Sequence, residues 1–137
     1  LTANLLAKQL SKTYESVSLV DTFNPADPGD TFDNLYYQTM TTVNNPLVVA
    51  LEEIDILIDD VHNSRIRRHR DLPISVYNKS TWTLFMDRFD REQFKNAILV
   101  MTSNKPKSYF DELDPAYLRQ GRIDLVFDIE EVKKKCE

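Results

Sequence analysis

The sequence contains only two glycines, Gly29 and Gly121, and a single cysteine, Cys136, among its 137 residues. Two glycines cannot form the loop Gly-x-x-x-x-Gly-Lys-Ser/Thr, whose backbone N–H groups surround bound phosphates, and no such segment occurs. One cysteine excludes an intramolecular disulfide, as is usual for intracellular proteins. No apolar run approaches the roughly 20 residues of a membrane-spanning helix, and the first residues show no signal-peptide pattern.

Positive charge is also in short supply. The 17 lysines and arginines are outnumbered by 22 aspartates and glutamates, which gives a formal net charge of −5. Net charge therefore does not favour bulk binding of nucleic acid.

The length corresponds to one domain or a large part of one, with enough residues to bury a core. We expect an intracellular protein, located in the cytoplasm or, as the alternative, in mitochondria.

Short continuous apolar runs alternate along the chain with segments in which apolar residues recur at helical spacing. The run Leu47–Leu51 is typical of a central parallel strand that is buried on both faces. This alternation predicts an α/β fold with a parallel sheet. We expect strands at 16–20, 47–51, 97–101 and 123–129. We expect helices at 1–12, 32–42 and 54–60, from Asn78 or Ser80 to Arg91, and from Asp114 onward, followed by a charged tail at 130–137.

Two adjacent carboxylates, Glu52 and Glu53, directly follow the first of the continuous apolar runs. In open parallel sheets ligands bind beyond the carboxyl ends of the strands. One carboxylate at such a place can hold Mg²⁺, and the next can orient and deprotonate an attacking water. The alternative is that the pair simply begins a solvated loop.

A polar amide and two arginines follow the second continuous run. Asn104 lies just beyond the strand expected at 97–101, and Arg119 and Arg122 are three residues apart further on. A guanidinium group can make bidentate contacts with phosphate oxygens. Carboxylates, an amide and paired arginines at strand ends together indicate phosphoryl transfer to water. The alternatives are turn chemistry for Asn104 and solvated cations at a helix end for the arginines.

The segment at residues 47–55 reads Leu-Val-Val-Ala-Leu-Glu-Glu-Ile-Asp. It resembles the Walker B segment of the AAA+ ATPases, in which an apolar strand precedes Asp-Glu-Ile-Asp. Glu52 stands in the place of the usual aspartate, and its longer side chain reaches a metal differently. Glutamate at this place also occurs in the AAA branch that contains the mitochondrial respiratory-complex-III assembly chaperone, where the pair reads Glu-Asp.

Three further segments resemble the same family in the same order. The helix expected at 1–12 resembles the helix that follows the phosphate-binding loop. Residues 99–104, Leu-Val-Met-Thr-Ser-Asn, resemble the sensor-1 strand, whose last polar residue helps to hold the γ-phosphate and the attacking water. Residues 113–124, Leu-Asp-Pro-Ala-Tyr-Leu-Arg-Gln-Gly-Arg-Ile-Asp, are similar to the second region of homology, Leu-Asp-Pro-Ala-Leu-Leu-Arg-Pro-Gly-Arg-Phe-Asp. The resemblance therefore covers nearly the whole chain.

The resemblance implies a three-layer α/β fold of the parallel-sheet P-loop NTPase type, with residues 1–137 as a partial AAA+ nucleotide-binding core domain. The phosphate-binding loop and its strand are expected before Leu1, with that strand placed between those at 97–101 and 123–129. The helical lid is expected after the last strand. We expect this incomplete core not to hydrolyse ATP efficiently by itself.

The resemblance also implies roles for the residues already singled out. Glu52 would support Mg²⁺ directly or through a water, Glu53 would activate the attacking water, and Asn104 would position it. Arg119 and Arg122 would be arginine fingers that reach the nucleotide of a neighbouring subunit. The expected cofactors are ATP and Mg²⁺. The expected assembly is a homo-oligomer, a hexameric ring that remodels or translocates a macromolecule, protein rather than nucleic acid.

Two loops fall where the family has its pore loops. Phe23 and Phe32 flank the first and are candidates for gripping a threaded chain, with core packing as the alternative. The second, at 62–71, is basic, and a solvated loop is the alternative to a binding role. Two other functions stay open: a non-catalytic AAA-like ring or scaffold subunit, and a nucleic-acid-handling ATPase that uses the basic loop. The cations of that loop are Arg65, Arg67, Arg68 and Arg70.

Overall fold

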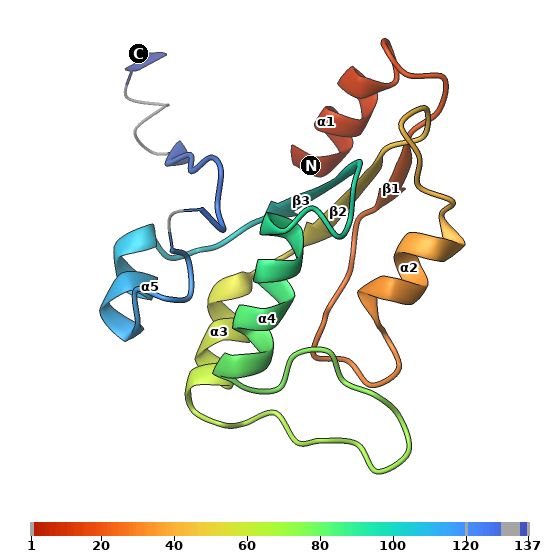
Figure 1. The fold of residues 1–137 in the computed structure, drawn as a ribbon. Helices are drawn as coiled ribbons and strands as arrows, with labels where there is room; N and C mark the ends of the chain where they lie inside the picture. Colours follow the sequence, from red (N-terminus) through yellow and green to blue (C-terminus); the bar gives the residue numbers. More distant parts are fainter. Residues whose placement is uncertain (1, 120, 130–134, 137) are drawn as a thin grey trace.

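The computed structural model describes residues 2–119, 121–129 and 135–136. At its centre is a three-stranded parallel sheet with the strand order β1-β2-β3. Helices lie around this sheet (Figure 1), which confirms the predicted α/β class. The strands are β1 (Ser18–Val20), β2 (Leu47–Leu51) and β3 (Ala97–Met101).

The helices begin and end near the residues that the sequence signals indicate. Thr31 caps α2 by accepting a hydrogen bond from the backbone N–H of Asn34, and Asn78 and Thr81 form a capping box at the start of α4. No helix in the described part of the chain is long and apolar enough to cross a membrane. The helices are α1 (Thr2–Leu10), α2 (Phe32–Gln38), α3 (Ile54–His62), α4 (Lys79–Asp90) and α5 (Lys107–Leu113).

Strand β2 is the centre of the core, and each of its residues is at most 1% exposed. Successive side chains of a strand point to opposite faces, so β2 contributes to two apolar clusters. Val48 and Ala50 pack with Ala3 of α1 on one face. Val49 belongs to the larger cluster on the other face, which includes Trp82 of α4. The sheet is thus covered on both faces, as a continuous apolar strand requires.

The register brings the ends of β2 and β3 to the same level. Leu47 pairs with Ala97 and Leu51 pairs with Met101, so the two strands start and finish together. The residues that follow them, at positions 52 and 102, leave the sheet side by side at its carboxyl edge. This edge is where open parallel sheets bind ligands.

The helix predicted from Asp114 onward is wrong. A helix that was not predicted, α5, ends at Leu113, and residues 115–118 form a turn. The Asp114 carboxylate accepts a hydrogen bond from the N–H of Ala116 at 2.8 Å, and the Asp114 carbonyl accepts one from the N–H of Tyr117 at 3.1 Å. Aspartate competes in this way with helical hydrogen bonds, so a residue that can cap a helix instead closes a turn.

The strand predicted at 123–129 is also wrong, because residues 124–128 form no strand. The side chains of Leu125 and Phe127 are 74% and 75% exposed. Within the described residues β3 pairs only with β2, so no neighbouring strand is in place to satisfy the N–H and C=O groups of this segment. An apolar alternating pattern forms a strand only where a partner is present.

Other boundaries differ by a few residues. The helix predicted at 32–42 ends at Gln38, because Met40 adopts a left-handed backbone with φ of 50°. The strand predicted at 16–20 is shorter and begins at Ser18. Leu1 and most of the tail predicted at 130–137 lie outside the described residues.

Candidate functional site

The carboxyl edge of the sheet carries the adjacent carboxylates Glu52 and Glu53, and both residues are exposed. The backbone of Glu53 has φ of 53° and ψ of 51°, the left-handed conformation. For a residue with a side chain this conformation costs roughly 1–2 kcal/mol, so the surrounding contacts must hold it. The sharp turn lets α3 begin directly behind the two carboxylates.

Thr102, the first residue after β3, supplies those contacts. Its hydroxyl accepts a hydrogen bond from the N–H of Glu53 at 3.1 Å and donates one to Glu52 Oε2 at 2.6 Å. Its carbonyl accepts a hydrogen bond from the N–H of Ile54 at 2.9 Å, and its N–H donates to the carbonyl of Leu51 at 3.0 Å. One residue of the neighbouring strand end therefore orients the Glu52 carboxylate and holds the backbone of Glu53.

Asp55 makes a second connection across this edge. It lies in the first turn of α3 and is 9% exposed, and its carboxylate accepts a hydrogen bond from the N–H of Asn104 at 3.2 Å. The first turn of a helix favours a negative charge, which helps to offset the burial of this carboxylate. The structure thus places Glu52, Glu53 and Asn104 at one edge of the sheet, as the sequence pattern predicts, and links them through Thr102 and Asp55.

The side chains at this edge suit a metal ion whose remaining ligands come from nucleotide phosphates and waters, rather than one held by protein ligands alone. No group of three or more histidine, cysteine, aspartate or glutamate residues among those described is arranged to hold a metal ion. Magnesium in nucleotide sites is bound by one or two carboxylates together with phosphates and waters. The exposed carboxylate of Glu52 fits that pattern. It also lines a hollow of about 360 Å³ with Thr22, Phe23, Asn24, Asp27 and Asp30.

The two predicted arginine fingers lie in different environments. Arg119 is exposed, and its side chain forms no hydrogen bond or ion pair within the described residues, although its carbonyl accepts a hydrogen bond from the N–H of Arg122 at 3.0 Å. The side chain of Arg122 is only 5% exposed. Its Nε donates to Asp87 Oδ1 at 2.6 Å, and its terminal NH1 group donates to the carbonyl of Ala116 at 2.7 Å. The structure therefore presents Arg119 to solvent and engages Arg122 within the chain.

Ion pairing alters the titration of the carboxylates around this segment. The hydrogen bond from Arg122 holds the pKa of Asp87 below its usual value, and Lys79 lowers the pKa of Asp114 in the same way. Burial raises the pKa of Tyr117, whose ring is 1% exposed. The carboxylates are thus held ionised where they anchor the arginine-bearing segment.

A comparison with known protein families identifies the domain to which these residues belong. The family described as ATPase family associated with various cellular activities (AAA) matches residues 1–131. The chain belongs to the AAA family. Its three-stranded parallel sheet and flanking helices fit an incomplete α/β P-loop NTPase core, so the predicted AAA+ domain and fold class are confirmed. No solved structure matches the chain.

Phe23 and Phe32, the two predicted pore-loop candidates, pack among other aromatic rings. Phe32 is 1% exposed, and its ring centroid lies 4.6 Å from that of Phe94 and 5.6 Å from that of Phe23. Phe23 is partly buried against the same cluster. Phe32 is therefore a core residue, which agrees with core packing, the alternative given for these two phenylalanines.

Two of the four arginines in the exposed basic loop contact neighbouring residues. Arg65 pairs with Asp59 at 2.5 Å, which raises the pKa of Arg65, and the Arg68 guanidinium lies 4.9 Å from the centre of the Tyr77 ring. Arg67 and Arg70 are exposed. The N–H of Val76 donates to the carbonyl of Pro25 at 2.9 Å and the N–H of Gly29 donates to the carbonyl of Pro73 at 2.8 Å, so the segment that follows the basic loop is joined to residues 25–29.

Proposed function

We propose that the intact protein of which this chain is a part hydrolyses ATP in a Mg²⁺-dependent reaction. The observation that carries the proposal is the hydroxyl of Thr102, which binds both Glu52 and Glu53 at the carboxyl edge of the sheet. This contact orients the carboxylate of Glu52 and fixes the backbone of Glu53, so two residues suited to support a metal and to act as a general base lie together at this edge. Residues 1–137 contain no glycine-rich phosphate-binding loop, so the proposal concerns the protein in which this core is joined to one.

Each residue of the site has a distinct task in this proposal. Glu52 would hold Mg²⁺, which neutralises charge on the phosphates when bound. Glu53 accepts a proton from the attacking water. Asn104, whose backbone is held by Asp55, orients that water and the terminal phosphate. Arg119 is exposed and stabilises the charge of the transition state in the nucleotide site of a neighbouring copy, a contribution of roughly 10³–10⁵ in rate for an arginine finger.

An arginine that acts on a neighbouring site requires an oligomer. We propose a closed homo-oligomeric ring, a hexamer by analogy with the family, in which turnover drives remodelling or translocation of a protein. Glu52 in place of aspartate is shared with the branch that contains the complex-III assembly chaperone, whereas Glu53 departs from the aspartate of that branch. The proposal places the protein inside the cell, where ATP is available.

Steady-state ATP turnover of the intact protein tests the proposal, measured beside its Glu53→Gln variant. We expect turnover that rises per subunit with protein concentration and is abolished by the substitution. The matched control is Glu92→Gln, which changes an exposed glutamate between α4 and β3, away from the carboxyl edge. A folded protein without turnover in any version would overturn the proposal and favour a non-catalytic ring or scaffold subunit.

A second candidate is an ATPase stimulated by nucleic acid. The observation that favours it is the exposure of Arg67 and Arg70 on an anchored loop. The double substitution Arg67→Ala/Arg70→Ala would then abolish stimulation by nucleic acid and leave basal turnover unchanged. Stimulation that persists in this variant, or that is absent from the unaltered protein, removes this candidate.

A further inference from the structure

The segment that carries the two arginines is attached to α4 at three places. Lys79 in the first turn of α4 forms an ion pair with Asp114. The indole Nε1 of Trp82 donates a buried hydrogen bond to the carbonyl of Tyr117 at 3.0 Å. Near the end of the helix, Asp87 pairs with Arg122. These attachments span nine helical positions, from Lys79 to Asp87, or about 12 Å of helix.

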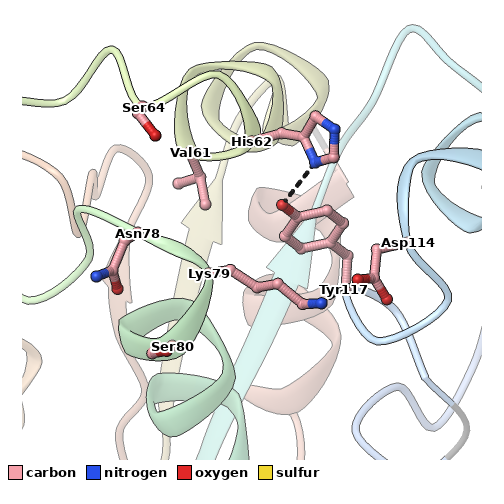
Figure 2. Close-up of a pocket in the computed structure, with 8 residues that line it drawn as sticks. All are labelled: Val61, His62, Ser64, Asn78, Lys79, Ser80, Asp114 and Tyr117. Carbon is pink, nitrogen blue, oxygen red and sulfur yellow. Dashed lines mark hydrogen bonds and ion pairs between the residues drawn. The ribbon is translucent and has the colours of Figure 1, made fainter.

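A fourth attachment comes from α3. The ring of Tyr117 is buried, and its hydroxyl lies 3.0 Å from Nδ1 of His62 at the end of α3. Figure 2 shows the Tyr117 ring between His62 and the side chains of Lys79 and Asp114, at the wall of a hollow of about 380 Å³. Tyr117, in the middle of the segment, is therefore bound to both α3 and α4.

The attachment at Arg122 differs from the others because it engages two of the three guanidinium nitrogens of a buried arginine side chain. One side of the group binds the Asp87 carboxylate and another binds the carbonyl of Ala116, within the segment itself. At 5% exposure, the side chain has little surface left for a phosphate of another subunit. Arg119 lies three residues earlier and is exposed. The two arginines that the family motif treats alike are thus structurally different in this chain.

We infer that Arg122 is a positioning residue: with Asp87 it fixes the turn that presents Arg119, and Arg119 alone reaches the nucleotide of the neighbouring subunit. The inference rests on the proposed ATPase function. It assigns a role to Asp87, a residue on α4 that lies outside every AAA motif matched above. Removal of either partner releases the same turn, so the two substitutions act through one interaction.

A double-mutant cycle on the intact protein tests this coupling. Misplacement of a catalytic group by about 1 Å can lower the rate about 10²-fold, so we expect Asp87→Ala and Arg122→Ala each to lower kcat by about that factor. The double variant should be no worse than either single variant, and Arg122→Lys should retain part of the rate. Asp90→Ala, which changes an exposed carboxylate at the end of the same helix, is the matched control and should leave kcat unchanged.

Mixed rings separate a positioning effect from simple damage to the fold. A Glu53→Gln subunit has an inactive site but a normal Arg119, whereas an Asp87→Ala subunit has a normal site and a misplaced Arg119. We expect mixtures of the two to turn over faster than either protein alone. A misfolded Asp87→Ala subunit would gain nothing from mixing, and that outcome would overturn the inference.

The alternative role of Arg122 gives a different pattern. If Arg122 contacts phosphate directly, Asp87→Ala leaves kcat near the unaltered value while Arg122→Ala alone abolishes turnover, and the inference fails. Arg119→Ala with an unaltered kcat would also overturn the inference. If Glu53→Gln abolishes turnover in the same assay, the proposed ATPase activity still stands. Absence of turnover in the unaltered protein would instead reject the proposed function. In that case amide exchange still tests the attachment of the turn, since Asp87→Ala should raise exchange at 114–122 and Asp90→Ala should not.

Discussion

The hydroxyl of Thr102 lies 2.6 Å from Glu52 Oε2, so the end of β3 orients a carboxylate at the end of β2. The same hydroxyl accepts the N–H of Glu53, whose backbone is left-handed. The carboxylate of Glu52 and the backbone of Glu53 consequently depend on a residue that belongs to neither their strand nor their motif. This dependence leads to the first prediction.

Replacement of Thr102 by valine removes both hydrogen bonds and keeps the shape of the side chain. Loss of an orienting partner of a metal-binding side chain typically weakens metal affinity about 10–100-fold. We therefore expect the Mg²⁺ concentration for half-maximal turnover of the intact protein to rise by that factor. Thr102→Ser retains the hydroxyl and should behave like the unaltered protein. An unchanged Mg²⁺ requirement in Thr102→Val would show that the contact does not orient Glu52 for the metal.

Asp55 is expected to support both stability and the placement of Asn104. Asp55→Ala removes the carboxylate partner of the N–H of Asn104, and the loss of a hydrogen bond typically lowers the free energy of unfolding by roughly 0.5–1.5 kcal/mol. Denaturant unfolding of the chain measures this loss. Asp55→Asn keeps an acceptor oxygen and should lose less. Equal stabilities for the alanine variant and the unaltered chain would contradict the prediction.

The aromatic cluster around Phe32 should behave as core. Phe32→Ala removes a ring that is 1% exposed, and such truncations typically lower the free energy of unfolding by about 3–5 kcal/mol. Leu84→Ala is the matched control, because Leu84 of α4 is 57% exposed and should change little. Comparable unfolding midpoints for the two variants would contradict the placement of Phe32.

Stability should fall in acid because several carboxylates are paired. Arg88 lowers the pKa of Asp33, and Arg122 lowers the pKa of Asp87, relative to the ordinary value of 3.8. A lowered pKa means that the contribution is complete above pH 3.8 and is lost as the pH falls through the folded-state pKa. We expect the Tm to drop steeply below about pH 4. Asp33→Asn should flatten that drop, measured by thermal unfolding across pH, and an identical pH profile would contradict the assignment.

The sequence determined those features that depend on neighbouring residues. Five continuous apolar residues make β2 a buried strand. The capping box of Asn78 and Thr81 fixes the start of α4 through local hydrogen bonds, which do not depend on how the helix packs. The position of Glu52 and Glu53 directly after β2 likewise follows from the order of residues, since strands of a parallel sheet end at one edge. The AAA motifs are short and contiguous, so they can also be recognised from the sequence without a structure.

Only the tertiary structure decided which distant residues meet. Thr102 is 50 positions from Glu52, and Asp87 is 35 positions from Arg122. Their contacts depend on the register of β2 with β3 and on the face of α4 that meets the turn at 115–118. Apolar alternation likewise did not make a strand of residues 124–128, because a strand exists only through hydrogen bonds to a partner. Local patterns specify what a segment can form, whereas pairing and packing energies, which arise between segments, decide what it does form.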